Sequence, residues 1–341
     1  MNIQHRITYD PDEIIRILEK YIDRLKIFRF DSRYRSLLGE TFTELLSRWE
    51  TDILNRKNDP FTLVVCGEFK RGKSSLINAL LGEEVVPVNV TTETVTLNRI
   101  TYGAHSNEAV LQGGRHMHLS DAEMQKENLE KLMRQEKIPF RQIEVKRPIE
   151  FLKYAAVIDT PGLGDSMQDF SELVEDALTQ ADAVLYVFSV NYPLSQTEQR
   201  SLKTMIVPQK YTDLLLVGNY LDMLESTKDY ERMNNLLVSR IQNLLPDQKP
   251  WLVSALDEQC RQMGEQRPNP DMEHELEAHF DRFREKIGQM VEEKKETILP
   301  DRMQRMMRGM AAELSESLRA LEEGLKMSSQ DVQAAMERVQ R

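Results

Sequence analysis

The sequence predicts an α/β domain whose mostly parallel sheet is covered by helices on both faces, flanked by an α-helical bundle. Short β-branched runs alternate with helical stretches from residue 60 to about residue 290, which is typical of βαβ units. Amphipathic helical patterns lie on either side of this region. The predicted strands are Leu63–Cys66, Val95–Ile100, Ala155–Ile158, Ala183–Phe188, Leu214–Val217 and Trp251–Val253.

Residues 1–59 are predicted to form the N-terminal helices of the bundle. Asp10 and Pro11 supply a capping side chain and a first-turn proline directly before an apolar pattern of helical spacing. A second pattern of the same period runs from Leu38 to Ile53 and stops before Pro60. Two amphipathic helices are therefore expected before the α/β domain begins.

Residues 291–341 are predicted to form the C-terminal helices of the bundle. Apolar residues there recur at alternating spacings of four and three, with Ser328 out of pattern, which favours packing against another helix. Because the pattern reaches Arg341 without a stop signal, we predict that the chain is a piece of a longer protein. The apolar positions are Leu314, Leu318, Leu321, Leu325, Val332, Ala335 and Val339.

Composition excludes several classes of protein. A formal charge of −11 argues against a partner that is nucleic acid, since such binding depends on neutralising phosphates. The two cysteines, Cys66 and Cys260, are too few for a disulfide framework and suit a reducing cytoplasm. Because aliphatic runs such as Leu214 to Val217 are too short to span a bilayer, contact with a membrane is expected to be peripheral.

The segment from Gly67 to Ser74 fits the pattern G-x-x-x-x-G-K-[ST], in which backbone amides curl around phosphates. Lys73 is expected to reach the outer phosphates and Ser74 to bind Mg²⁺. An apolar strand precedes the segment and a helix follows it, whereas a fortuitous glycine turn would need neither. The predicted nucleotide-binding residues of this loop are Gly67, Lys70, Arg71, Gly72, Lys73, Ser74 and Ser75.

A second motif, Asp159-Thr160-Pro161-Gly162, follows a predicted buried strand. Asp159 can hold a magnesium-bound water there, and the Gly162 amide can sense a γ-phosphate. The alternative is a plain turn, because the same residue types favour turns.

Asn219 and Asp222 follow the strand Leu214–Val217. A carboxylate at Asp222 can accept from the N1 and N2 donors of guanine, which predicts GTP and GDP as ligands. Tyr220 stands where GTPases usually have Lys, and we expect its ring to stack on the base. Ser254 and Ala255 form a later small-residue loop whose amide is expected to reach guanine O6. The alternative is that Asn219 to Asp222 is an ordinary surface loop.

The threonine-rich segment between the two phosphate motifs, Pro87 to Thr96, predicts a mobile threonine that binds Mg²⁺ when a γ-phosphate is present. Thr92 is the preferred candidate to complete the magnesium shell, with Thr91 and Thr94 as alternatives, and a β-prone strand edge would also explain the threonines. Leu163 follows Gly162 and has no polar group that could orient a water molecule for attack on the γ-phosphate. Hydrolysis would then depend on a main-chain group, Thr92, or a charge from Lys70 or Arg71, unless these two are simply solvated loop charges.

These motifs together resemble those of the bacterial dynamin-like proteins. The segments that carry the resemblance are Gly67 to Gly82, Pro87 to Thr96, Asp159 to Gly164 and Pro193 to Glu198, within about residues 61–256. The resemblance implies a Ras-like P-loop GTPase domain over 60–290 that hydrolyses GTP to GDP with Mg²⁺. It also implies a homodimer through that domain, movement of the bundle, a second dynamin-like protein as a partner, and membrane remodelling.

Two other functions compete with this hypothesis. One is a GTP-dependent assembly or scaffold module whose slow hydrolysis only times dimerisation. The other is a translation or ribosome-assembly GTPase that associates with RNA, against which the acidic balance and the long helical flanks argue.

Overall fold

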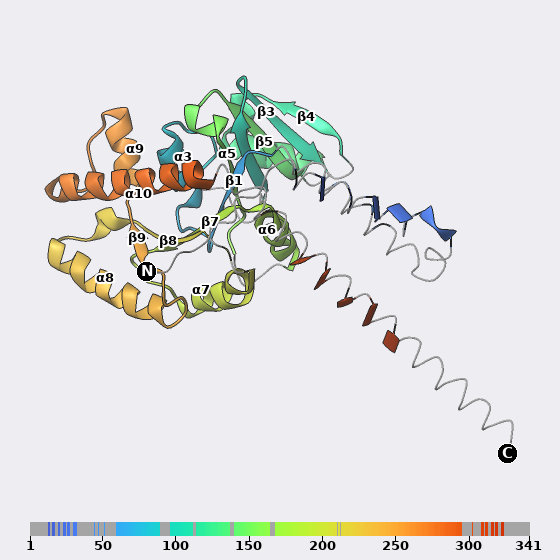
Figure 1. Ribbon diagram of the computed structural model, residues 1–341. Coiled ribbons are helices and arrows are strands. Elements are labelled where there is room, and N and C mark those ends of the chain that lie inside the picture. The colour runs from blue at the N-terminus through green and yellow to red at the C-terminus, as the bar shows by residue number, and fades with distance from the viewer. Residues whose placement is uncertain are drawn as a thin grey trace, which may run out of the picture. The chain divides into compact units, whose positions relative to one another are not determined.

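The computed structural model divides the chain into two compact units, residues 1–59 with 296–341 and residues 60–295 (Figure 1). It describes residues 59–88, 96–111, 114–136, 140–163, 168–209, 211 and 213–294, together with scattered positions within 13–51 and 302–323. The predicted helical seam from Leu314 to Val339 and the threonines Thr91, Thr92 and Thr94 thus fall largely or wholly outside the described residues.

The described strands form one sheet in the order β4-β3-β5-β2-β6-β1-β7-β8-β9. Its half from β6 to β9 is parallel throughout, and β2 joins this half antiparallel to β6. The predicted α/β class with a mostly parallel sheet is confirmed. The strands are β1 (Phe61–Cys66), β2 (Leu97–Tyr102), β3 (Ser106–Leu111), β4 (His116–Leu119), β5 (Phe140–Arg147), β6 (Ala155–Asp159), β7 (Ala183–Ser189), β8 (Leu214–Asn219) and β9 (Pro250–Leu252).

Helices cover both faces of the parallel half of the sheet. Figure 1 shows α3, α9 and α10 on one face and α6, α7 and α8 on the other. The longer helices are α3 (Lys73–Leu81), α5 (Lys126–Glu136), α6 (Gln168–Gln180), α8 (Thr227–Gln242), α9 (Ala255–Met263) and α10 (Glu273–Lys294). Shorter elements are α4 (Asp121–Met124), η2 (Glu150–Lys153), α7 (Gln196–Ser201), η3 (Leu202–Ile206), η4 (Val207–Gln209), η5 (Leu221–Met223) and η6 (Pro270–Met272).

The central strands are buried on both faces, which explains their continuous apolar sequences. Every residue of β1, β6, β7 and β8 is buried. Parallel strands sandwiched between helix layers need apolar residues at both odd and even positions. Strands could be predicted over these segments because their apolar runs are continuous. The carboxyl ends of these strands lie at one edge of the sheet.

Strands β3, β4 and β5 were not predicted from the sequence. They lie between β2 and β6 in the chain and extend the sheet through antiparallel pairing of β3 with β4 and β5. Burial alternates along β3, since its Asn107, Ala109 and Leu111 are buried and the residues between them are half-buried. Such half-polar strands give a weaker sequence signal than a continuous apolar run.

None of the helices that the structure describes is both long and apolar enough to cross a membrane. The longest of them, α10, extends to Lys294 and so ends slightly beyond the predicted domain boundary at residue 290.

Replacing Phe280 by Ala is expected to lower the free energy of unfolding by about 3–5 kcal/mol, because a large core side chain leaves a cavity that its neighbours cannot fill. Phe280 is 1% exposed and packs edge-to-face on Phe283 at a centroid distance of 5.9 Å. Guanidinium chloride unfolding followed by circular dichroism measures the change. Met263→Ala, at a side chain 62% exposed, is the control, and equal effects of the two substitutions would contradict the described core.

Candidate nucleotide-binding site

The loop between β1 and α3 depends on two glycines. Gly67 has φ 146° and Gly72 has φ 78°, both in the region that favours glycine. A Cβ on Gly67 would lie 2.1 Å from the carbonyl oxygen of Val187, and one on Gly72 would lie 2.2 Å from Asn219 Nδ2. The close approach of β7 and β8 therefore requires glycine at both positions, and the loop curls tightly before α3 begins at Lys73.

Lys73 lies folded under this loop. Its Nζ donates to the carbonyl oxygens of Gly67 and Glu68, at 3.0 Å each, and the residue is 7% exposed. Burial lowers the pKa of Lys73, and the nearby charge of Asp159 opposes that change. The amine is thus held by weak neutral acceptors that a phosphate oxygen can replace.

Ser74 and Asp159 meet beside the phosphate loop. Ser74 Oγ donates to Asp159 Oδ2 at 2.8 Å, which joins the start of α3 to the end of β6. Asp159 Oδ1 is buried and has no hydrogen-bond partner among the described residues. Burial raises the pKa of Asp159, whereas Lys73, then Ser74 and then Asn98 on the neighbouring strand β2 lower it. A hydroxyl beside a carboxylate with an unused oxygen is an arrangement that fits Mg²⁺, a cation that prefers oxygen ligands.

The segment after Asp159 packs directly on the phosphate loop. The Leu163 amide donates to the Gly67 carbonyl at 3.1 Å, and the Phe69 amide donates to the Leu163 carbonyl at 3.3 Å. A Cβ on Gly162 would lie 2.6 Å from Phe69 Cα. The structure thus brings Gly162 against the phosphate loop, whereas Thr92 lies outside the described residues.

Asn219, at the end of β8, connects three loops. Its Nδ2 donates to the carbonyl oxygens of Arg71 at 3.2 Å and Gly72 at 3.4 Å. Its Oδ1 accepts from the amides of Tyr220 at 2.8 Å and Ala255 at 3.0 Å. This residue is 1% exposed, so the junction excludes water. The Ala255 amide therefore donates to Asn219 in this structure, and its predicted donation to guanine O6 stays a prediction.

Asp222 lies beside this junction in η5. Its Oδ1 accepts from Ser254 Oγ at 2.5 Å, and Ser254 also caps α9 by accepting from the Asp257 amide at 3.0 Å. Burial raises the pKa of Asp222, and the hydrogen bond from Ser254 lowers it. Asn269, which the sequence analysis missed, donates from Nδ2 to the carbonyl oxygen of Asp222 at 3.2 Å. Asp222 is thus held through its carboxylate by Ser254 and through its backbone carbonyl by Asn269, at the position predicted for guanine recognition.

Tyr220 occupies the position between Asn219 and Asp222 with a left-handed backbone at φ 72°. Its hydroxyl donates to the Lys70 carbonyl oxygen at 3.2 Å. Burial raises the pKa of Tyr220, so the hydroxyl keeps its proton and stays a donor. The half-buried ring thereby spans from the loop after β8 to the phosphate loop.

The two basic residues of the phosphate loop differ in their surroundings. Lys70 is exposed and has a left-handed backbone at φ 60°. Arg71 instead donates from Nε to Glu198 Oε1 at 2.8 Å and from Nη2 to Glu68 Oε2 at 2.6 Å. The alternative that both are solvated loop charges is therefore wrong for Arg71, whose side chain is 16% exposed. Glu198 was not anticipated as a contributor to this loop.

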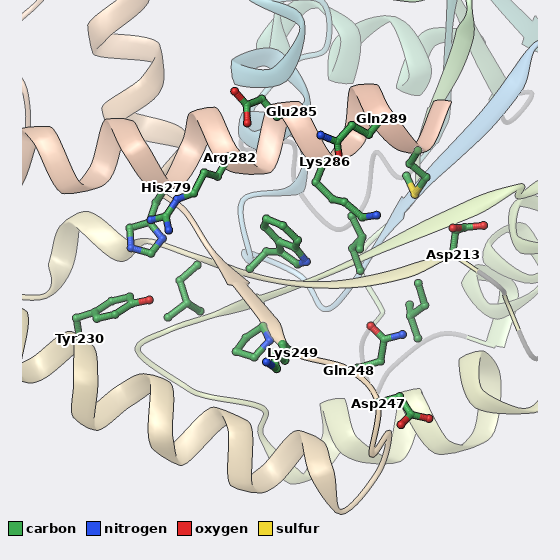
Figure 2. Close-up of a pocket in the computed structure, with 16 residues that line it drawn as sticks. Asp213, Tyr230, Asp247, Gln248, Lys249, His279, Arg282, Glu285, Lys286 and Gln289 are labelled. Atoms are coloured by element: carbon green, nitrogen blue, oxygen red, sulfur yellow. The ribbon is translucent and has the colours of Figure 1, made fainter. Parts of the chain in front are cut away.

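A separate groove lies along the edge strand β9, and its volume is about 670 Å³. Figure 2 shows Tyr230 reaching it from α8 and Arg282, Lys286 and Gln289 from α10. Asp213, just before β8, and Leu214, its first residue, also line the groove. None of the predicted site residues is among the side chains that line this groove, since they gather at the opposite ends of the strands.

The fold and this site together define a P-loop nucleotide-binding domain of the GTPase class. Residues 63–219 match the family model described as Dynamin family, a range that runs from β1 to Asn219. Residues 63–219 therefore carry a dynamin-family domain, which confirms the resemblance seen in the motifs of this range.

Several known proteins are similar to the chain. It is 28% identical over 204 residues to a bacterial dynamin-like protein of Nostoc punctiforme, covering 54% of this chain and 28% of that protein. It is 24% identical over 292 residues to dynamin-like protein 1 of Campylobacter jejuni, covering 73% of this chain and 40% of that protein. The chain thus spans less than half the length of these curated relatives.

The chain also resembles a solved structure of an oligomerised bacterial dynamin pair that provides a mechanism for the long range sensing and tethering of membranes. The TM-score is 0.57 at 18% identity, and the match covers 99% of this chain and 52% of that one. At this identity the likeness concerns the fold.

Gly72→Ala is expected to weaken GDP binding by about 100-fold. The new Cβ would displace the side chain of Asn219, and an alanine at this position would have to adopt an unfavourable backbone conformation. Gly82→Ala is the matched control, since Gly82 has a similar φ of 75° but nothing within 4 Å of the added Cβ. Titration with a fluorescent GDP analogue measures both. Equal losses of affinity would show that backbone strain alone, and not the junction, is responsible.

Proposed function

We propose that this protein binds guanine nucleotide with Mg²⁺ and hydrolyses GTP to GDP and phosphate. The observation that carries the proposal is the Ser74–Asp159 pair at 2.8 Å, set at the mouth of the glycine loop. Nucleotide phosphates placed in that loop would meet the helix α3 amino terminus, Lys73 and the metal ligands together. The dynamin-family match over this same segment supports the assignment.

The residues that would hold Mg²⁺ are Ser74 directly and Asp159 through bound water. The buried, unpartnered Oδ1 of Asp159 supports this role, because an acceptor without a donor is costly unless a ligand supplies one. Thr92 remains the proposed third contributor when a γ-phosphate is present. The metal would neutralise charge on the phosphates, and Lys73 would do the same from beneath the loop.

Recognition of the base is proposed to rest on Asp222 and Tyr220. Asp222 would accept from both donors of the guanine edge, which adenine does not present in that pattern. The Tyr220 ring would stack on the base while its hydroxyl stays bound to the Lys70 carbonyl oxygen. Ser254 would keep the carboxylate oriented through its 2.5 Å hydrogen bond.

Hydrolysis is proposed to need a second copy of the chain. Leu163, 8% exposed, offers no group that could orient water, whereas Lys70 is an exposed cation on the loop. Three large apolar side chains, Tyr192, Met223 and Leu256, are 65%, 59% and 49% exposed in the segments after β7, β8 and β9. A homodimer through this face would cover them and exclude water from the nucleotide.

Coupling of nucleotide state to the helical unit is the mechanical part of the proposal. Movement of these helices would remodel or tether a membrane by peripheral contact, with a second dynamin-like protein as a further partner. The solved bacterial dynamin pair, which is described as sensing and tethering membranes, supports this extension through its similar fold.

GTP turnover per molecule is expected to rise with protein concentration, because the active species is a dimer. Phosphate release from GTP and from ATP, measured over a hundredfold range of protein concentration, tests this, with Lys73→Ala as the inactive control. A slow rate that does not depend on concentration would instead favour the scaffold whose hydrolysis only times assembly. Leu163 is compatible with that function too, because it has no group that orients water.

Asp222→Asn is expected to lower GTP affinity by about 10–100-fold, because an amide replaces one acceptor of the guanine donors by a donor. Xanthosine triphosphate carries an oxygen in place of the guanine amino group, so the variant is expected to prefer it. Competition against a fluorescent nucleotide measures both affinities. An unchanged preference for GTP over xanthosine triphosphate would remove Asp222 from base recognition.

A further inference from the structure

Arg71 is bound on two sides by carboxylates. Its Nε donates to Glu198 at 2.8 Å and its Nη2 to Glu68 at 2.6 Å, and its guanidinium lies 5.7 Å from the centre of the Tyr192 ring. The Glu198 side chain is fully buried and that of Glu68 is 15% exposed. Such charge-assisted hydrogen bonds between poorly solvated groups hold a loop far more firmly than exposed pairs do.

The two carboxylates belong to a connection between the phosphate loop and the start of α7. Glu198 Oε2 accepts from the Ser195 amide at 2.7 Å, and Glu68 Oε1 accepts from Thr197 Oγ1. The backbone carbonyl of Glu198 accepts from Tyr186 of β7 at 3.3 Å. Each carboxylate thus uses one oxygen for Arg71 and the other for the start of α7, so the guanidinium ties the phosphate loop to α7.

The backbone next to Arg71 is held as well. Asn219 Nδ2 binds the Arg71 carbonyl oxygen, and the Tyr220 hydroxyl binds that of Lys70. Lys70 has a left-handed backbone, a conformation that a non-glycine residue adopts only where its surroundings impose it. The anchors on Arg71 therefore also fix where the side chain of Lys70 leaves the loop.

We propose that Arg71 is a positioning residue that, with Glu68 and Glu198, locks the loop in its phosphate-binding conformation, and that it is not a charge that contacts the transferred phosphoryl group. This inference rests on the proposed function and replaces the catalytic role expected for Arg71. An arginine that contacts the transferred phosphoryl group acts on the transition state, whereas a loop anchor acts on every phosphate that the loop binds.

The two roles predict opposite patterns in Arg71→Ala. Loss of the anchor is expected to weaken GDP and GTP binding alike, by about tenfold, and to leave kcat at saturating GTP within about threefold of the wild-type value. Loss of a contact to the transferred phosphoryl group would lower kcat by about 10³-fold or more and leave GDP affinity nearly unchanged. Stopped-flow dissociation of fluorescent GDP and steady-state hydrolysis separate these results.

Glu198→Gln and the double variant Arg71→Ala with Glu198→Gln complete the test. The anchor predicts that Glu198→Gln weakens GDP binding nearly as much as Arg71→Ala, and that the double variant loses no more than the worse single one. Arg71→Lys should recover part of the affinity. Arg200→Ala, which removes an exposed arginine of the same helix α7, is the matched control and should behave as wild type.

Wild-type GDP affinity in Glu198→Gln, or a loss confined to kcat in Arg71→Ala, would overturn the anchor. If Arg71→Ala loses both affinity and kcat, the effect of Glu198→Gln decides, because only an anchor requires that carboxylate. Circular dichroism melting identifies any variant that does not fold, and Arg71→Lys then replaces Arg71→Ala in the comparison. A wild-type chain that binds no guanine nucleotide would instead refute the proposed function and leave the anchor without a ligand.

Discussion

The side chain of Asn219 holds together the loops that follow β1, β8 and β9. Its amide nitrogen binds two carbonyl oxygens of the phosphate loop and its oxygen binds the amides of Tyr220 and Ala255, all within 3.4 Å. A buried amide supplies a donor and an acceptor at one fixed separation, which neither a carboxylate nor an aliphatic side chain can do. The junction forms only because parallel strands end at the same edge of the sheet, so strand order and register come first and the site follows.

Burial of opposite charges prepares this site for a ligand that carries charge of its own. Burial lowers the pKa of Lys73 and raises that of Asp159, while each residue partly offsets the change in the other. Phosphates would satisfy the amine, and a divalent cation would satisfy the carboxylate oxygen that has no described partner. The same logic separates Arg71 from Lys70, because the buried Glu198 already satisfies the guanidinium and the exposed ammonium stays available.

The fold and the motif residues could be predicted where the signal is local. Continuous apolar runs marked β1, β6, β7 and β8, and short motifs after them marked Asp159 and Asp222. The contacts of Glu198 and Asn269 were not predicted because they cross 127 and 47 residues of chain, although Glu198 ends one of the segments that carry the family resemblance. The hydrogen bond from the Ala255 amide to Asn219 was also not predicted, because only three-dimensional packing brings these two residues together.

Isothermal titration of the wild-type chain with GDP and with ADP, each with Mg²⁺ and with a chelator, tests the central claim most directly. The claim is that one edge of the sheet combines phosphate, metal and guanine recognition. The account predicts binding of GDP at one site per chain, no detectable binding of ADP, and weaker GDP binding once Mg²⁺ is removed. Equal affinity for the two nucleotides would contradict the role of the Asp222 loop, and absence of binding to either would contradict the site as a whole.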